Sequence, residues 1–347
     1  MFSLDPSILA SAALLPEQIK QAWEEVSALK LPEEFKKVGN IIVAGMGGSA
    51  LGARIIDALA FEILTVPLEI VNGYHLPAYV GPNSLVIISS YSGNTEETVS
   101  CAVEAIKKKA QIFLISTGGK IGLLSKKKKL PAYIFNPKFN PAKQPRLGLG
   151  YSIASQMAVL ARSGLINLEK GQLTEVINFL KDQEEKASLS TPISRNPAKQ
   201  MAQALKGRAI AIISSEHLVG AAHAFKNMIN ENSKNFAAGF SIPEMNHHLL
   251  EGLAHPRQNR KFLKFVFLES ALYDSEIKKR FKITQEIVRR NKVPVFNWVL
   301  KGRTRLTQVF EVVYLGAFVS SYLALAYRVD PIPIPWVDYF KAELKKF

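Results

Sequence analysis

Short apolar runs alternate with amphipathic segments along most of the chain. Uninterrupted apolar runs are typical of strands buried on both faces, whereas apolar positions spaced three and four apart are typical of helices. The pattern predicts helices at residues 51–61, 95–108 and 309–326, and two more that end near residues 228 and 290. It predicts strands at residues 40–44, 68–71, 85–89, 112–116, 133–135, 208–213, 262–268 and 293–299.

This alternation of strand and helix predicts an α/β protein with doubly wound parallel sheets flanked by helices. A charged, Ser/Thr-rich stretch at residues 184–196, broken by Pro192 and next to Pro197, indicates a linker. We therefore expect a first domain at residues 1–185, with a helical segment at its N-terminus, and a second at residues 186–347. The two halves repeat one architecture, although their sequences are not evidently alike.

The most apolar segment lies near the end of the chain. Residues 312–327 contain no charge, and Glu311 and Arg328 bound them. A membrane-spanning helix needs about 20 apolar residues, so this segment predicts a buried core helix and no membrane span. Residues 330–335, with prolines at every second position, cannot form a helix interior and predict a stiff connection to a short final helix at residues 336–341.

Composition narrows the environment and the partners. Cys101 is the only cysteine, which excludes an internal disulfide and fits a reducing, cytoplasmic compartment. No Cys/His cluster has zinc spacing, and the N-terminus lacks the basic region of a secretory signal. The net charge of +15 favours anionic partners. The lysine runs at residues 107–109 and 126–129 are not interleaved with aromatic residues, so we expect solvated surface and no nucleic-acid binding.

A hydroxyl-rich turn at residues 90–95 follows one predicted strand and leads into a helix start. Backbone N–H groups at such a turn, together with the hydroxyls of Ser90, Ser92 and Thr95, form a nest for an oxyanion. No lysine is built into the turn, so it is not a nucleotide P-loop. The turn predicts a site for one phosphate on a small molecule.

A glycine-rich turn at residues 45–49 follows another predicted strand. It matches a dinucleotide fingerprint poorly, because Ala50 stands where a third glycine is expected and no acidic residue is well placed about 20 positions on. We therefore expect no nicotinamide cofactor. Gly47, Gly48 and Ser49 fit close approach of the backbone to a sugar or sugar phosphate equally well.

Acid–base chemistry has its candidates in the second half of the chain. Glu231 and His247 could divide the work of base and acid, although Glu231 taken alone also fits an exposed helix end. Adjacent His247 and His248 do not lie on one face of an element, which argues against a metal site. Arg146 lies in a loop rich in Pro and Gly, and Lys341 on the final helix. Both also fit a solvated surface position.

Together these motifs identify a resemblance that covers nearly the whole chain. The sequence resembles the archaeal-type bifunctional phosphoglucose/phosphomannose isomerases of the SIS-domain phosphosugar isomerase superfamily. The hydroxyl turn is specific only to the superfamily, whereas the separation of the Glu and the His and the lysine on the terminal helix are more specific. The motifs are Gly45-Met46-Gly47-Gly48-Ser49, Ser90-Tyr91-Ser92-Gly93-Asn94-Thr95, Pro145-Arg146, Asn230-Glu231-Asn232, Glu244-Met245-Asn246-His247 and Val337-Asp338-Tyr339-Phe340-Lys341.

The resemblance implies two SIS domains, each with a mainly five-stranded parallel sheet, and a homodimer whose active site is shared between subunits. It implies interconversion of glucose 6-phosphate, and also mannose 6-phosphate, with fructose 6-phosphate, without metal or cofactor. In that scheme Glu231 moves a proton between C1 and C2, and Arg146 stabilises the enediolate. His247 of the neighbouring subunit and Lys341 open the ring. Six residues bind the substrate: Gly47, Gly48, Ser49, Ser90, Ser92 and Thr95.

Several questions stay open at the level of sequence. His248 stands where many relatives have a polar amide, so either imidazole could act in ring opening. Ile332 and Ile334 occupy a stretch that often holds a threonine in the family, which leaves the mannose epimer unsettled. A non-catalytic sugar-phosphate-binding protein and an isomerase of amino-sugar phosphates are the alternatives. A regulator would not need Glu231 or Lys341, and a glutaminase partner domain would need an N-terminal cysteine, which Cys101 is not.

Overall fold

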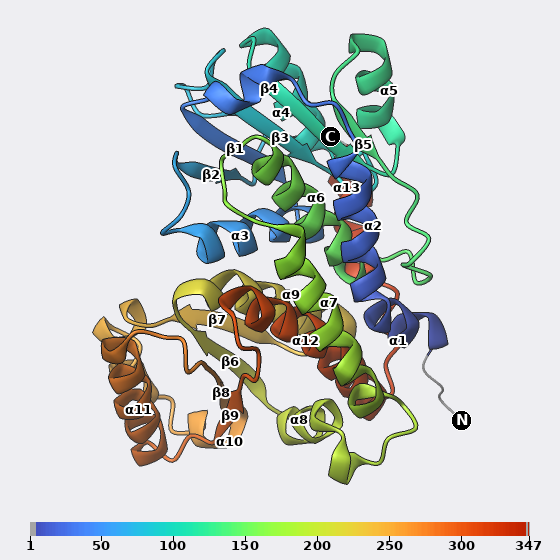
Figure 1. Cartoon of the computed structure of the whole chain (residues 1–347). Coiled ribbons are helices and arrows are strands. Elements are labelled where there is room, and N and C mark those ends of the chain that lie inside the picture. Colours follow the sequence, from blue (N-terminus) through green and yellow to red (C-terminus); the bar gives the residue numbers. More distant parts are fainter. Residues whose placement is uncertain (1–4, 345, 347) are drawn as a thin grey trace.

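The computed structural model describes residues 5–344 and 346, and it contains two parallel sheets (Figure 1). The first has five strands in the order β2-β1-β3-β4-β5, and the second has four in the order β7-β6-β8-β9. All neighbouring strands are parallel. The strands are β1 Asn40–Gly45, β2 Leu68–Val71, β3 Ser84–Ser89, β4 Gln111–Ser116, β5 Ala132–Ile134, β6 Ala209–Ser214, β7 Ala237–Ser241, β8 Leu263–Glu269 and β9 Val295–Val299.

The predicted α/β class with parallel sheets and a C-terminal helix is confirmed. The second sheet differs in detail, since it has four strands where five were expected. The principal helices are α1 Pro6–Ala13, α2 Leu15–Ser27, α3 Gly48–Ala60, α4 Glu96–Lys107, α5 Gly119–Lys128, α6 Leu149–Arg162, α7 Lys170–Ala187, α8 Pro197–Leu205, α9 Val219–Ser233, α10 Asn259–Phe262, α11 Ser275–Arg290, α12 Arg305–Tyr327 and α13 Pro335–Leu344.

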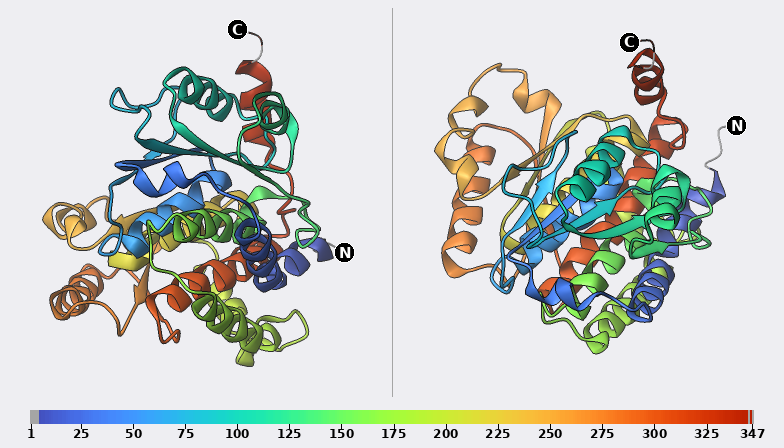
Figure 2. Two further views of the ribbon diagram at one scale, coloured as in Figure 1. Left: turned by 45° about the horizontal axis from the view of Figure 1, so that its top comes forward. Right: turned by 90° about the horizontal axis from the view of Figure 1, so that it is seen from above.

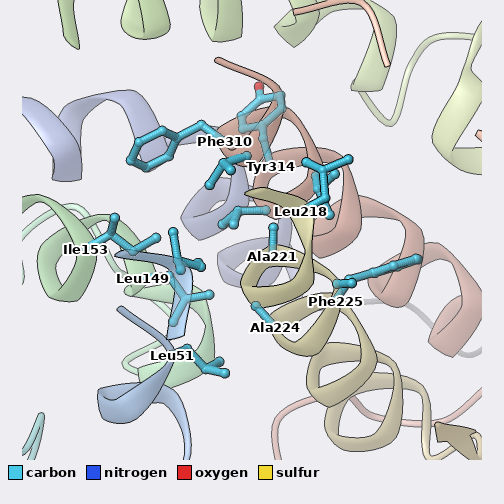
Figure 3. Close-up of a cluster of buried hydrophobic side chains, with 14 of the residues drawn as sticks. Leu51, Leu149, Ile153, Leu218, Ala221, Ala224, Phe225, Phe310 and Tyr314 are labelled. Carbon is cyan, nitrogen blue, oxygen red and sulfur yellow. The ribbon is translucent and has the colours of Figure 1, made fainter. Parts of the chain in front are cut away.

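A layer of helices lies between the two sheets and unites them. Helices α3 and α6 from the first half pack against α9 and α12 from the second, and their apolar side chains belong to one continuous core. The predicted boundary between residues 185 and 186 falls in the last turn of α7 and stays a prediction. Figure 3 shows part of this core, with Leu51, Leu149, Ile153, Leu218, Ala221, Ala224, Phe225, Phe310 and Tyr314 labelled.

The two halves approach each other closely at a glycine near the start of α9. A Cβ atom at Gly220 would lie 2.2 Å from the carbonyl oxygen of Arg54 in α3. Only a residue without a side chain allows the two backbones to meet there. The crossing of α3 and α9 therefore fixes how the first sheet sits on the second.

The outer faces of the sheets have their own cover. Helices α4 and α5 pack on the first sheet, where Cys101 is buried in a separate apolar cluster. Helix α11 covers the second sheet with Phe281 and Val288, which are both buried. The segment predicted as a core helix is α12, which is long and apolar enough to span a membrane, but 89% of its most apolar window is buried in this protein. The prediction of a buried core helix is therefore confirmed.

Helix α13 follows residues 330–334, which we call the proline strap. It leaves the body of the molecule beside the first sheet (Figure 2), and none of its described residues is buried. Its apolar side chains face solvent, and Trp336 is 82% exposed. An exposed apolar surface of this kind is available for contact with another molecule.

Candidate active site

The hydroxyl turn at residues 90–95 lies between β3 and the start of α4, at the carboxyl edge of the first sheet. Ser90 Oγ donates to Thr95 Oγ1 at 3.2 Å, and Thr95 makes no capping hydrogen bond to the helix. The first N–H groups of α4 therefore have no side-chain acceptor, as a helix N-terminus that binds an anion requires. We call residues 90–95 the phosphate nest.

Gly93 allows the nest to adopt its shape. Its φ of +71° lies in the left-handed region, and a Cβ there would stand 1.9 Å from the carbonyl oxygen of Gly118. The Gly93 N–H donates to both the carbonyl oxygen and Oγ of Ser90. Any larger residue would push the nest away from the loop that follows β4.

The glycine turn at residues 45–49 joins the nest to the rest of the site. Ser49 Oγ accepts a 2.8 Å hydrogen bond from the backbone N–H of Tyr91, inside the nest. On the other side, a Cβ at Gly48 would lie 3.1 Å from the carbonyl carbon of Pro145. The loop that contains Arg146 therefore rests directly on this turn. Gly48 and Ser49 thus connect the nest with the loop of Arg146, and binding of the sugar by Gly47, Gly48 and Ser49 stays a prediction.

Arg146 is a buried cation, only 2% exposed, and it is not the surface arginine that the loop composition alone would allow. All five guanidinium N–H groups have protein acceptors within hydrogen-bond distance. Burial lowers its pKa, and the carboxylate of Glu231 opposes that shift. The acceptors are Asn232 Oδ1 for Nε (2.6 Å), Gln144 Oε1 (2.9 Å) and Glu231 Oε2 (3.4 Å) for NH1, and the carbonyls of Pro331 (2.6 Å) and Ile332 (2.9 Å) for NH2.

Glu231 lies in the last turn of α9 with its carboxylate towards Arg146, and its side chain is 31% exposed. The neighbouring asparagines fix this helix end. Asn230 exchanges hydrogen bonds with the backbone of Ala237, and buried Asn232 donates to Ser320 Oγ of α12. Burial raises the pKa of Glu231, while the positive charges of Arg146, Lys234 and Lys341 lower it.

The positive charge of Lys341 on α13 lowers the pKa of Glu231, although no direct contact joins the two side chains among the described residues. The strap brings α13 to this side of the molecule because Arg146 holds the carbonyls of Pro331 and Ile332. The predicted lysine thus reaches the neighbourhood of the predicted base from 110 positions further along the chain.

His247 and His248 are not brought to this site within one chain. They lie in and just after a 3₁₀ turn that follows the carboxyl end of β7, whereas Glu231 precedes the amino end of the same strand. Both are exposed, and His248 Nε2 lies 2.8 Å from Glu244 Oε1. Met245, which is fully buried, anchors the turn. The imidazoles therefore face outward from the opposite end of the sheet.

Sequence reasoning missed the residues that position Arg146. Asn232 was noted only as part of a motif, and Gln144 lies two positions before Arg146 in the same loop, yet both accept hydrogen bonds from the guanidinium. The sequence offered one signal for them: Gln144 and Asn232 are amide residues that stand next to charged residues along the chain. No group of three or more His, Cys, Asp or Glu side chains with metal-binding geometry occurs in the part of the chain described by the structure.

A family model and several solved structures are similar to this chain. Residues 194–344 match a family model described as the bacterial phospho-glucose isomerase C-terminal SIS domain. Among solved structures, a hypothetical protein of Thermus thermophilus superimposes with a TM-score of 0.75 at 16% identity, covering 99% of this chain and 91% of its own. The C-terminal domain of glucosamine-fructose-6-phosphate aminotransferase of Francisella tularensis superimposes with a TM-score of 0.64 at 15% identity, covering 92% and 95%. The likenesses to solved structures establish the fold alone.

Curated relatives give the family. A bifunctional phosphoglucose/phosphomannose isomerase of Caldicellulosiruptor bescii is 31% identical over 331 residues, which cover 95% of this chain and 96% of the relative. The isomerase of the same name from Aquifex aeolicus is 29% identical over 325 residues, covering 93% and 94%. The chain belongs to the bifunctional phosphoglucose/phosphomannose isomerase family, as its motifs indicated.

Proposed function

We propose that this protein interconverts glucose 6-phosphate with fructose 6-phosphate, and mannose 6-phosphate with fructose 6-phosphate, through an enediolate. The observation that carries the proposal is the pairing of Glu231 with buried Arg146 at 3.4 Å, directly beside the glycine turn and the phosphate nest. A base, a fixed positive charge and an anion site in one place suit proton transfer next to a carbonyl. The family's activity agrees with this chemistry.

The phosphate nest would hold the substrate by its 6-phosphate through Ser90, Ser92 and Thr95, remote from the reacting carbons. Ring opening needs a proton on the ring oxygen and loss of one from the anomeric hydroxyl. An imidazole and an ammonium suit this near neutral pH. We assign the task to Lys341 and to His247 of a second subunit. Phosphate binding then supplies energy for orientation.

Proton transfer follows in the open chain. The carboxylate of Glu231 takes the proton from C2 of the aldose, and the negative charge moves to O1 of the enediolate. The protonated carboxyl returns the proton to C1 while the hydroxyl proton on O2 passes to O1, which yields the ketose. Because every N–H group of Arg146 already has a protein acceptor, Arg146 would stabilise the enediolate as a buried positive charge and not through a free donor.

Substitution of the base tests this proposal. Glu231→Gln keeps an oxygen that can accept from Arg146 but cannot take a proton, so we expect kcat to fall by about 10³-fold with each sugar phosphate while binding persists. Coupled assays give the rates, and calorimetry gives the affinity. Binding of all three sugar phosphates by the wild type without turnover would contradict the isomerase assignment. Full activity of Glu231→Gln would remove Glu231 as the base.

We also propose a homodimer with shared active sites. Two observations support it: His247 lies at the far end of β7 from Glu231, and α13 presents Trp336 and Phe340 to solvent. A two-fold dimer would place the imidazole of one subunit against the carboxylate of the other. The single cysteine, Cys101, fits a cytoplasmic enzyme, and proton transfer through an enediolate requires no metal or redox cofactor.

Mixed dimers test the shared site sharply. Glu231→Gln and His247→Ala are each expected to be inactive alone. Co-expressed, half of the dimers would contain one of each, with one intact site, so about a quarter of wild-type activity should return. His248→Ala serves as the control and should retain activity. No recovery in the mixed dimers, or an active monomer, would overturn the shared site.

An amino-sugar substrate is the second candidate. A D-glucosamine-6-phosphate 4-epimerase of Sulfolobus acidocaldarius is 26% identical over 251 residues, covering 72% of this chain and 75% of the relative. Including glucosamine 6-phosphate in the same assays decides between the two. A higher kcat/KM with glucosamine 6-phosphate than with glucose 6-phosphate would favour the amino sugar.

A further inference from the structure

Lys234 is a residue without a role in the mechanism above, yet it lies against the predicted base. It caps the C-terminus of α9 in the left-handed conformation, with φ of +54°. From there its Nζ donates to the backbone carbonyl of Glu231 at 2.6 Å. It also donates to the carbonyl of Pro331 in the proline strap at 3.3 Å. One ammonium group therefore joins the end of the base's helix to the strap.

The strap is fastened at this point by two cations. The carbonyl of Pro331 accepts from Arg146 NH2 as well as from Lys234, and both cations also contact Glu231. Proline limits backbone freedom, so bonds at one position fix the direction of the segment that follows. The segment that follows is α13, which carries Lys341. The position of Lys341 thus depends on bonds made beside Glu231.

We propose that Lys234 is a positioning residue of the isomerase reaction, which holds the strap against the end of α9 and keeps the carboxylate of Glu231 in a positive environment. The inference rests on the proposed function, since it assigns Lys234 a part in that same site. Lys234 would touch neither the substrate nor the reacting atoms. It acts through Glu231 and, by way of the strap, through Lys341.

The charges around Glu231 determine the direction in which its pKa should change when Lys234 is replaced. Arg146 from the loop before α6, Lys234 from the end of α9 and Lys341 from α13 all lower the pKa that burial raises. Lys234 in turn faces Arg146, Glu231 and Asp330 of the strap. Removal of the Lys234 charge should therefore raise the pKa of Glu231. The acid limb of the pH profile, where kcat/KM falls because the base becomes protonated, should then move to higher pH.

Three variants test the proposal. Lys234→Met removes the charge and both hydrogen bonds, and Lys234→Arg keeps the charge. The control is Lys129→Met, because Lys129 caps α5 in the same left-handed conformation with φ of +54° and lies on a different element from Glu231 and the strap. We expect Lys234→Met to lower kcat about tenfold and shift the acid limb upward. Lys234→Arg should have the acid limb of the wild type. Lys129→Met should change neither kcat nor the acid limb.

Hydrogen exchange gives a readout that does not depend on activity. Amides of residues 332–344 should exchange faster in Lys234→Met than in the wild type and in Lys129→Met, because the strap loses one of its two fastenings. Lys234→Gln is a second neutral variant should the methionine impair folding. A wild type without isomerase activity would refute the proposed function, while the exchange data would still test the strap.

Two results would overturn the inference. One is an acid limb in Lys234→Met identical to that of the wild type at the same melting temperature. The other is strap exchange in Lys234→Met equal to that in Lys129→Met. A general loss of stability would lower the melting temperature and activity together but would leave the acid limb in place, which separates a structural role from the proposed one.

Discussion

A buried guanidinium organises the site at the scale of single residues. Arg146 is tolerated at 2% exposure because each of its donors has an acceptor, and unpaired buried donors would be costly. Its acceptors come from its own loop, from α9 and from the strap. The planar fork offers five donors in fixed directions, whereas the ammonium of a lysine has only three and could not satisfy all five acceptors.

Glu231 gives a prediction at this scale. Burial raises its pKa above 4.5, so folding favours the neutral carboxyl. The stability that this group contributes is fully present below pH 4.5 and is lost as the pH rises through the raised pKa of the folded state. The free energy of unfolding of the wild type relative to Glu231→Gln should therefore decrease between about pH 5 and pH 7.

Urea unfolding of both proteins at the two pH values measures this difference, and all other titrating groups cancel in the comparison. The acid limb of kcat/KM should likewise lie above the usual range for glutamate, because the base must be ionised. A difference that grows in favour of the wild type as the pH rises would show that the three cations outweigh burial.

The surroundings of the candidate site residues could be predicted from the sequence only in part. The nest and the glycine turn are local motifs, so their shape follows from neighbouring residues. The acceptors of Arg146 lie up to 186 positions away, and no local pattern indicates them. The relation of His247 to Glu231 depends on which end of β7 each occupies, and β7 itself was missed.

Helices and strands at the next scale show where a sequence pattern fails. Strand β7, Ala-Ala-Gly-Phe-Ser, lies at the edge of its sheet and is only partly buried, and it contains none of the Val or Ile residues that mark the buried strands. The central strands β3 and β6 and the core helix α12 were predicted because almost all of their residues are buried. An element that is buried on all sides consists almost entirely of apolar residues, and this makes it recognisable in the sequence. Edge elements lack this pattern.

The crossing of α3 and α9 yields a prediction about elements. Gly220→Ala would place a methyl group 2.2 Å from the carbonyl oxygen of Arg54, so we expect a loss of about 2 to 3 kcal/mol of stability. Gly171→Ala is the matched control. Gly171 is also the second residue of its helix, α7, and a Cβ there meets nothing within 4 Å.

Alanine is the better helix former, so Gly171→Ala should raise stability slightly, by up to about 1 kcal/mol. Denaturant unfolding of the two variants makes the comparison. Equal effects of both substitutions would show that α3 and α9 can separate without cost. In Gly220→Ala we also expect weaker substrate binding, because the nest and Glu231 lie on opposite sides of the crossing.

The whole molecule combines two sheets, one shared helical core and a strongly basic surface. The lysines at residues 126–129 are exposed, as the sequence predicted, and the net charge is +15. A sugar phosphate approaching this surface is attracted over a distance that salt controls. The positive net charge therefore affects how the anionic substrate associates with the protein, and it does not determine the fold.

We therefore expect KM for fructose 6-phosphate to rise between about 10 mM and 150 mM salt, where the Debye length falls from about 30 to 8 Å. The value of kcat should change little, because the bound phosphate is held by short-range contacts. Steady-state kinetics at each salt concentration provide the measurement, with sucrose at equal osmolarity as the control. A KM independent of salt would mean that the positive surface does not attract the substrate.

The strap also has a consequence for how the protein is made. A ribosome synthesises Arg146 and Asn232 well before residues 331 and 332, and it completes α12 before the strap. Until the strap emerges, the NH2 group of Arg146 lacks both of its carbonyl acceptors. A segment synthesised after α12 therefore completes the hydrogen bonding of a cation that belongs to the first half of the chain. A chain interrupted after α12 would have nearly all of its core and an unfinished active site.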